Sequence, residues 1–408
     1  MTTHAITAFR RFNQFSRIAR RNGPRSLYVS SARYYASTAS PSTANPQPQH
    51  NKPPTGILLM NLGGPSTTDE VHDFLLRLFS DRDLIPLPFQ RYLAPLIAKR
   101  RTPKIQDQYQ QIGGGSPIRA WTDKQGKLMT EILDRISPET APHKHYIGFR
   151  YARPLTEDAL EQMKADGVSR AVAFTQYPQY SCSTTGSSLN ELYRKLKQFD
   201  PEQRIQWSVI DRWPTHPGLV EAFAKKIEAA LLNYSPEARK EVVLLFSAHS
   251  LPMSVVLRGD PYPFEVAATV SRVMERLGHK NPYRLVWQSK VGPSAWLGPA
   301  TSTSVESLAK KGHKNILLVP IAFTSDHIET LFELDLELGE EAEKLGITGL
   351  KRAESLNDDP LFIQAMADLV KANLVSQQTV SPQMLFQCPD CRNDTCRQQK
   401  QFFKEQKL

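Results

Sequence analysis

The sequence lacks any apolar run that could cross a membrane, and it has few cysteines. Its longest apolar stretch, Ile316–Phe323, is far shorter than the roughly 20 residues that span a bilayer. Four cysteines in 408 residues are too few for a disulfide scaffold, so we interpret them as thiols or metal ligands. The glycine-rich turns at 63–64 and 113–115 have neither a Walker lysine nor G-x-G-x-x-G spacing, which argues against a nucleotide site.

Acidic residues are absent from the first 54 positions. This segment is rich in arginine and serine and supplies eight of the ten net positive charges, so the body is almost neutral. Apolar residues from Phe9 to Ile18 are spaced to share one helical face, a pattern typical of a mitochondrial transit peptide. We therefore predict a transit peptide over 1–35, cleaved near Ala36, and a disordered lead-in over 36–54. A basic nucleic-acid-binding arm is the alternative.

Short β-branched or apolar runs alternate with helical patterns along the rest of the chain. This alternation predicts an α/β fold with two Rossmann-like, doubly wound domains and buried parallel sheets, because a closed barrel would require eight evenly spaced units. We expect domains at 55–226 and 227–376 and a C-terminal extension at 377–408. The expected strands are Gly56–Leu62, Tyr146–Phe149, Ala171–Thr175, Trp207–Ile210, Val242–Phe246, Leu285–Gln288 and Asn315–Phe323. The expected helices are Glu70–Leu78, Asp123–Arg135, Leu155–Asp166, Gly218–Leu232, Pro263–Leu277 and Thr303–Lys311.

The segment 84–101 is apolar and aromatic, contains three prolines and ends in the basic triplet Lys99-Arg100-Arg101. We expect the prolines to break the helix, which leaves leucine and phenylalanine without a continuous buried face. Such a segment favours a lip that inserts partly into an anionic membrane surface or covers an apolar ligand. An ordinary helical hairpin of the core is the alternative.

Three of the four cysteines fall within one short polar segment near the C-terminus. Cys388, Cys391 and Cys396 have C-x2-C-x4-C spacing, whereas Cys182 lies far upstream. This pattern suits an iron–sulfur cluster or a zinc ion.

Acidic residues and histidine follow the most apolar predicted strand. Asp326 and His327 come first, and glutamates then recur at every fourth position, at Glu329, Glu333, Glu337 and Glu341. Like charges at this spacing destabilise an isolated helix, so the stripe costs stability unless something positive passes along it. Carboxylates with imidazole suit Fe(II) and also suit proton transfer, although a solvated acidic face is the plainer interpretation.

Two further residues extend this candidate site. His249 lies at the equivalent strand end of another unit and is our first candidate for a general base. Trp296 lies in a proline-flanked turn, where it could pack against a flat apolar ligand.

These motifs resemble one known family. The segments FSAHSLP, FTSDHIETLFELDLE, FTQYPQYSCSTTGSSLN, QSKVGPSAWLGP, RRTPKIQDQY and MNLGGP are closely similar to those of mitochondrial protoporphyrin ferrochelatases, over about residues 55–400. The resemblance implies the chelatase fold and insertion of Fe(II) into protoporphyrin IX, with release of two protons, to form protoheme. It also implies a homodimer bound peripherally to the matrix side of the inner mitochondrial membrane, with no nucleic-acid partner.

The resemblance also implies roles for individual residues. His249 would accept pyrrole protons and bind Fe(II) together with Glu329, and the metal and proton route would continue through Asp326, His327, Glu333 and Glu337. The residues implied to hold the porphyrin are Arg101, Tyr109, Ser116, Arg150 and Tyr151, together with Trp296 and the turn at Leu62, where animal members have methionine. His216 and Asp368 match positions with catalytic roles in the family. A 2Fe-2S cluster would bind Cys182, Cys388, Cys391 and Cys396.

Two non-enzymatic alternatives remain at this point. An iron sensor or electron-transfer protein would use the cysteines but would leave His249, His327 and Glu329 idle. A two-domain metal-binding protein without catalysis would not explain the apolar segment 84–101.

Overall fold

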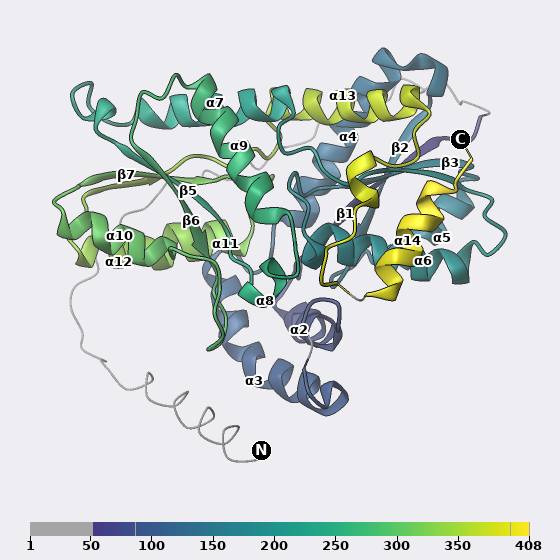
Figure 1. Cartoon of the computed structure of the whole chain (residues 1–408), viewed down its shortest axis with the longest axis horizontal. Helices are drawn as coiled ribbons and strands as arrows, with labels where there is room; N and C mark the ends of the chain where they lie inside the picture. Colours follow the sequence, from purple (N-terminus) through teal and green to yellow (C-terminus); the bar gives the residue numbers. More distant parts are fainter. Residues whose placement is uncertain (1–51, 86, 392, 408) are drawn as a thin grey trace, which may run out of the picture. The chain divides into compact units, whose positions relative to one another are not determined.

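Two parallel four-stranded sheets form the frame of the protein. The computed structural model describes residues 52–85, 87–391 and 393–407. Its strands are β1 (Thr55–Asn61), β2 (His143–Phe149), β3 (Arg170–Thr175), β4 (Gln206–Ile210), β5 (Val243–His249), β6 (Tyr283–Gln288), β7 (Asn315–Pro320) and β8 (Gly349–Arg352). The sheet orders are β2-β1-β3-β4 and β6-β5-β7-β8 (Figure 1). Because the order reverses between β1 and β3, and between β5 and β7, both sheets are doubly wound, and the predicted fold class is confirmed.

The strands form where the apolar runs were expected. Every residue of β1 is buried, and all of β5 is buried except its last residue, as in sheets that are covered on both faces. Leu58 pairs with Tyr146 and Ala173, and Leu244 pairs with Tyr283 and Leu317. The eighth strand, β8, was not predicted because its sequence, GLKR, is short and half polar.

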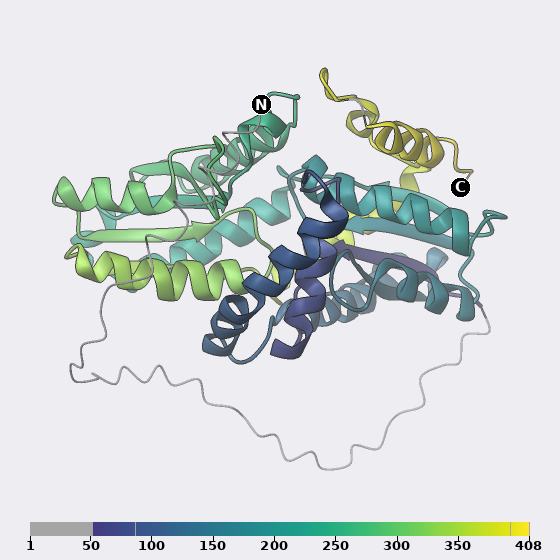
Figure 2. The ribbon, with the colours of Figure 1, turned by 90° about the horizontal axis from the view of Figure 1, so that it is seen from below.

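One layer of helices covers a face of both sheets, and separate helices cover the two remaining faces (Figures 1 and 2). The shared layer contains α4 (Ile118–Ile136), α7 (Pro217–Leu231), α9 (Tyr262–Arg276) and α13 (Pro360–Ser376). It packs into one apolar core with Leu59 and Phe174 of the first sheet and with Phe246 and Leu317 of the second. The opposite face of the first sheet carries α5 (Thr156–Ala165), α6 (Ser187–Phe199) and α14 (Asp394–Lys404), and that of the second carries α10 (Thr301–Lys310) and α12 (Leu338–Lys344). The boundary expected at residue 226 lies within α7.

The segment expected to be broken by prolines is instead largely helical. Helix α3 (Gln90–Gln111) contains Pro95 and Pro103 and packs on α2 (Val71–Ser80) through an apolar cluster. A proline removes one helical hydrogen bond and strains the preceding turn, and here tertiary packing stabilises the helix despite that cost. The prediction of a helix break at Pro95 is therefore wrong.

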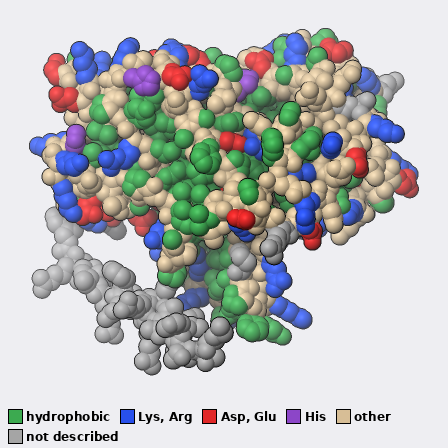
Figure 3. All heavy atoms as spheres, viewed as in Figure 1, with side chains coloured by type: hydrophobic (Ala, Val, Ile, Leu, Met, Phe, Trp, Pro, Cys, Tyr) green, Lys and Arg blue, Asp and Glu red, His purple; other side chains and the backbone are tan. Residues whose placement is uncertain are grey.

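An exposed apolar face is nevertheless present on this hairpin. The exposed fractions of Phe89, Tyr92 and Leu96 are 80%, 73% and 59%, and apolar side chains gather at its tip (Figure 3). Within the described ranges, no helix has both the length and the apolarity needed to cross a bilayer. The predicted transit peptide and most of the lead-in lie outside the described residues.

Candidate functional site

The site begins at the carboxyl ends of β5 and β7. His249 is the last residue of β5, and Glu329 lies in α11 (Ile328–Thr330), which follows β7 after a short turn. The Nδ1 atom of His249 is 2.8 Å from Oε2 of Glu329. Since the strand order reverses between β5 and β7, a crevice forms at their carboxyl ends, and the fold joins in it two residues that are 80 positions apart.

Each member of this pair stabilises the charged form of the other. Burial acts to lower the pKa of His249, but the charge and hydrogen bond of Glu329 more than offset it, and the pKa of His249 is raised above 6.5. Burial acts to raise the pKa of Glu329, whereas His249, His327 and Ser289 lower it to about 2. The pair is partly exposed, and the carboxylate makes the imidazole more basic, so a proton that His249 accepts is stabilised.

A serine bridges Glu329 to the next glutamate. The hydroxyl of Ser289 donates to Oε2 of Glu333 at 2.5 Å and lies 3.4 Å from Oε2 of Glu329, while its N–H donates to Oε1 of Glu333 at 2.7 Å. The side-chain amide of Gln288 donates to the Glu329 carbonyl at 2.9 Å and to Glu333 at 3.2 Å. Burial and the charge of Glu329 raise the pKa of Glu333. Sequence reasoning missed Gln288 and Ser289, although both follow from the end of β6.

The glutamate stripe does not run along a regular helix. Residues Leu331–Glu337 form a π-helix between α11 and α12, so the spacing of four no longer keeps one face. Glu333 faces Ser289, whereas Glu337 is exposed and Glu341 is half-buried.

The charge of Glu329 also raises the pKa of three tyrosines, of which Tyr109 and Tyr262 are buried and Tyr177 is half-buried. Burial raises the pKa of Tyr109, Tyr177 and Tyr262, and the charge of Glu329 raises each further. The Tyr177 hydroxyl donates to Oδ1 of Asn61 at 3.0 Å and accepts the N–H of Leu62 at 3.1 Å. The MNLGGP turn is thereby fixed near the site. Tyr109 was predicted, and Tyr177 and Tyr262 were not, although Tyr177 closely follows the end of β3.

His327 and Trp296 lie at this site, each in contact with a neighbouring ring. The His327 ring stacks edgewise on Phe323 at 4.7 Å, and its Nδ1 is 3.0 Å from the Ser325 carbonyl. The Trp296 ring lies 6.5 Å from the His249 ring. The structure therefore brings Trp296 near His249 and His327 near Glu329.

Asp326 belongs to a different hydrogen-bond network. Its carboxylate accepts from Ser355 at 2.7 Å and Asn357 at 2.9 Å, and it pairs with Arg352 at 3.1 Å. Burial acts to raise its pKa, but Arg352 and these hydrogen bonds lower it. The network fixes the turn that carries His327 and Glu329, so Asp326 supports that turn.

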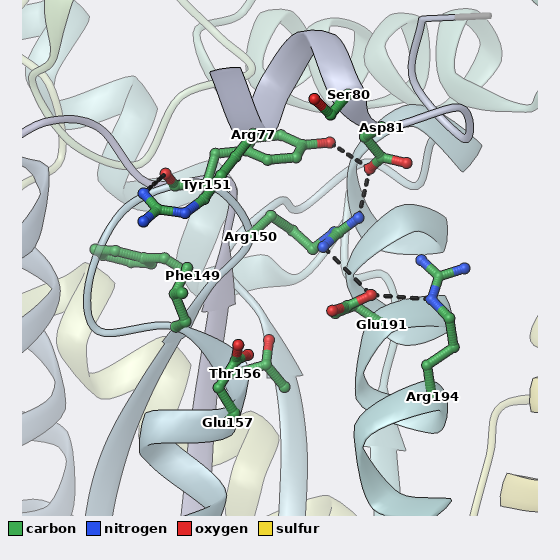
Figure 4. A pocket seen from close by; sticks show the side chains of 11 residues that line it. Arg77, Ser80, Asp81, Phe149, Arg150, Tyr151, Thr156, Glu157, Glu191 and Arg194 are labelled. Carbon is green, nitrogen blue, oxygen red and sulfur yellow. Dashed lines mark hydrogen bonds and ion pairs between the residues drawn. The ribbon is translucent and has the colours of Figure 1, made fainter. Parts of the chain in front are cut away.

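The predicted porphyrin-binding residues lie in the first half of the body. Arg150 and Tyr151 follow β2 and line a cavity of about 340 Å³ (Figure 4), where Arg150 pairs with Asp81 and the Tyr151 hydroxyl donates to Asp81 at 2.7 Å. The backbone N–H groups of Arg150 and Tyr151 donate to the carbonyls of Asn61 and Leu62, each at 3.0 Å. Both residues are thus attached to the Leu62 turn.

Two further predicted porphyrin-binding residues, Arg101 and Ser116, lie on α3 and in the turn that follows it. Arg101 is half-buried on α3, its guanidinium lies 5.7 Å from the Phe79 ring centre, and burial lowers its pKa. Ser116 is buried in the glycine-rich turn after α3, and its N–H donates to the Pro65 carbonyl at 2.7 Å.

His216 and Asp368 are near each other but, over the residues that the structure describes, are not bonded to His249 or Glu329. His216 caps the start of α7 and Asp368 is exposed on α13, where it accepts from Gln364 at 2.9 Å. Burial lowers the pKa of His216, and Asp368 partly offsets this effect. Among the described residues, no hydrogen bond joins either of them to His249 or Glu329.

The four cysteines are half-buried thiols within electrostatic range of one another. Burial raises the pKa of Cys182, Cys388 and Cys396, and neighbouring thiols contribute in the case of each. The N–H of Cys182 donates to Asp260 at 2.8 Å. In the part of the chain that is described, no three or more His, Cys, Asp or Glu side chains converge closely enough to hold a metal ion.

Comparison with known proteins points to a single family. The Ferrochelatase family model matches residues 54–374. The chain is 62% identical over 363 residues to "Ferrochelatase, mitochondrial" of Bos taurus, covering 89% of this chain and 87% of that protein. It is 50% identical over 394 residues to the protein of the same name from Schizosaccharomyces pombe, covering 96% and 93%. Among solved structures, SirB from Bacillus subtilis with Fe3+ has a TM-score of 0.46 and 13% identity, covering 78% of this chain and 95% of that one.

Proposed function

This chain belongs to the ferrochelatase family and inserts Fe(II) into protoporphyrin IX to form protoheme, and we propose that His249 and Glu329 perform the central proton and metal chemistry. The enzymatic function excludes the two non-catalytic alternatives. Protoporphyrin carries two inner N–H groups, and both protons must leave as the dication enters. The site therefore requires a base and a ligand set that replaces the water around the metal.

The single observation that supports this assignment is the 2.8 Å contact between His249 and Glu329. Because Glu329 engages Nδ1, Nε2 is the ring nitrogen available to accept a pyrrole proton. The imidazolium that forms is stabilised by the adjacent carboxylate. Carboxylate and imidazole are also suitable ligands for Fe(II), so Glu329 would receive the metal as water is lost, together with His249 before Nε2 of that ring takes a proton.

We infer that protons leave through the bridge at Ser289. Its hydroxyl contacts both Glu329 and Glu333, and the raised pKa of Glu333 favours transient protonation there. Glu337 lies at the exposed end of the π-helix and would pass the proton to solvent. Asp326 would support this route by fixing the turn.

The porphyrin would lie between the carboxyl ends of the strands of the first sheet and those of the second. Arg101, Tyr109, Ser116, Arg150 and Tyr151 would hold the macrocycle and its propionates. Trp296 would pack on its flat face, and Leu62 would provide an apolar contact without a thioether. Roles for His216 and Asp368 stay predictions.

The experiment that tests the function compares three proteins. Purified protein should metallate protoporphyrin with iron or zinc, and fluorescence should report the insertion. His249→Ala should bind porphyrin normally, but its turnover rate should fall by about a hundredfold or more, the usual cost of losing a general base. Glu341→Gln, beyond the π-helix, should remain close to wild type. Unchanged turnover in the histidine variant would refute the assignment.

We propose that the enzyme is mitochondrial and binds peripherally to the matrix side of the inner membrane. The relatives are named mitochondrial. The apolar tip at Phe89, Tyr92 and Leu96 precedes Lys99 and Arg100 on the same helix. Apolar insertion combined with basic residues suits an anionic lipid surface.

We also propose that Cys182, Cys388, Cys391 and Cys396 hold a 2Fe-2S cluster. The C-x2-C-x4-C spacing and the mutual influence of the thiols support this proposal, and the four side chains would draw together when the cluster binds. When bound, such a cluster supplies a redox-active centre. The residues themselves would join the extension at 377–408 to the body.

A second copy of this chain is the partner that we propose for one apolar surface. Leu257, Phe264 and Phe386 are 72%, 78% and 75% exposed, and Val291 is 49% exposed. These segments adjoin, because Asp390 N–H donates to the Arg258 carbonyl at 3.4 Å and Met253 N–H donates to the Ala295 carbonyl at 2.9 Å. An exposed apolar surface of this kind marks an association site, and Figure 3 shows hydrophobic side chains gathered on the face over α9.

A further inference from the structure

The Asp83 carboxylate connects three segments that are far apart in the sequence. It lies in the loop between α2 and α3, and its side chain is only 16% exposed. Both terminal nitrogens of Arg194 donate to Oδ2 at 3.1 Å, and Asn190 donates to it at 3.3 Å. The side-chain amide of Asn393 donates to Oδ1 at 3.1 Å. The loop is thus tied to α6 and also to the C-terminal segment.

Asn393 in turn holds one of the cysteines. It is the N-cap of α14, and its side-chain oxygen accepts the N–H of Cys396 at 3.0 Å. The helix packs on α6, where the rings of Tyr193 and Phe402 are 5.4 Å apart. One carboxamide therefore fixes Cys396 through its oxygen and Asp83 through its nitrogen.

The same loop leads to Arg150 and Tyr151. The N–H of Asp83 donates to Oδ1 of Asp81 at 2.9 Å, and Asp81 pairs with Arg150 and accepts from Tyr151 at 2.7 Å. Figure 4 shows Asp81 between these two side chains at the edge of the cavity. Three consecutive hydrogen bonds therefore connect the cysteine-bearing segment with two residues of the proposed porphyrin wall.

The loop also sets the start of the apolar hairpin tip. The side-chain amide of Gln90, the first residue of α3, donates to the Ile85 carbonyl at 3.0 Å and to the Phe79 carbonyl at 2.7 Å. Movement of residues 81–85 would thus disturb both Asp81 and the beginning of α3.

We propose that Asp83 is a positioning residue, through which the C-terminal cysteine segment fixes the loop 81–85 and thereby orients Arg150 and Tyr151 for porphyrin binding. The inference rests on the proposed function only in assigning porphyrin to these two residues. The link itself requires no particular metal on the cysteines. Release of the cysteine segment should loosen the loop and weaken substrate binding while leaving the His249–Glu329 pair intact.

The test replaces only the link between Asn393 and Asp83. Asn393→Asp keeps a good N-cap, but it places a carboxylate opposite Asp83 where a donor stood. A hydrogen bond to a charged group contributes enough that its loss should speed amide hydrogen exchange of residues 81–90 by about tenfold. The KM for porphyrin should rise several-fold with little change in kcat. Glu340→Gln, which alters an exposed carboxylate on α12, is the matched control and should change neither.

A double variant separates the link from general damage. Asp83→Asn combined with Asn393→Asp restores a donor facing a carboxylate, with the roles exchanged, so exchange and KM should return part of the way to wild type. Unchanged exchange of residues 81–90 in Asn393→Asp would overturn the proposal. A double variant whose hydrogen exchange and KM are no better than the two single changes predict together would also overturn it. The double variant gives this answer even if Asn393→Asp alone fails to fold. If wild type did not metallate porphyrin, the proposed function would fail, whereas the exchange result would still decide the link.

Discussion

Replacing Glu329 with glutamine should lower the pKa of His249 and slow metal insertion. The substitution keeps the shape of the side chain and an oxygen that can accept from Nδ1, but it removes the charge. Two unit charges about 4 Å apart interact by roughly 4 kcal/mol at an effective dielectric constant of about 20. The side chains of His249 and Glu329 are 38% and 28% exposed, so solvent screens the pair and on the order of 1–2 kcal/mol remains. The pKa of His249 should therefore fall.

The two pKa shifts also determine the pH range in which the His249–Glu329 pair stabilises the fold. The pKa of Glu329 is lowered from 4.5 to about 2, so its stabilising effect is present above pH 4.5 and is lost as the pH falls towards 2. The pKa of His249 is raised above 6.5, so its effect is present below pH 6.5 and is lost as the pH rises through the raised value. The pair should stabilise the fold most between these limits. The glutamine variant should lose stability chiefly in that window.

The assay follows both the imidazole and the reaction. NMR titration of the His249 ring should show the lower pKa, and the acid limb of the rate of zinc insertion should move to lower pH by the same amount. The maximal rate should fall about tenfold, because the imidazolium that forms loses on the order of 1–2 kcal/mol of stabilisation. Glu341→Gln is the control and should leave both unchanged. A His249 pKa that stayed constant or rose in Glu329→Gln would refute the electrostatic reasoning.

Three further predictions concern the proposed cluster, membrane contact and dimer. Cys396→Ser should abolish visible charge-transfer absorption and lower the melting temperature, since a bound centre stabilises the native state. If anaerobically purified wild-type protein were colourless, contained stoichiometric zinc and lacked acid-labile sulfide, the cluster would be contradicted. Phe89→Ser with Tyr92→Ser should reduce binding to anionic vesicles several-fold while insertion in detergent continues, and unaltered vesicle binding would count against the membrane contact. Phe264→Glu should shift the protein towards monomers in sedimentation, unlike Leu232→Glu at an exposed leucine outside this surface, and equal masses for both variants would exclude this surface as the interface.

The sequence predicts the parts of the site that follow strand ends. Buried parallel strands have near-continuous apolar runs, so the ends of β5 and β7 were visible, and His249, His327 and Glu329 were expected to meet at one sheet edge. Tyr262 could not be found in this way, because its approach to Glu329 depends on how α9 packs. The bonding of Asp326 to Arg352 was equally hidden, since it involves the unpredicted strand β8.

Local rules also failed where packing decided the outcome. Proline was expected to end the helix at Pro95, but the apolar contacts of α3 with α2 outweigh the lost hydrogen bond. The regular spacing of the glutamates indicated one helical face, whereas the π-helix directs Glu333 to Ser289 and leaves Glu337 exposed. A single-residue change in helical register is not visible in the periodicity of four acidic residues.

The shared strand order of the two sheets makes the body an internal pseudo-repeat. In this repeat β1 corresponds to β5, and since both strands have seven residues, Asn61 and His249 occupy the same position in their copies. In the first copy this position holds the Asn61 amide, which accepts a hydrogen bond from Tyr177, and in the second it holds the His249 imidazole beside Glu329. Under the proposed function, the repeat places ligand binding in the first copy and acid–base chemistry in the second.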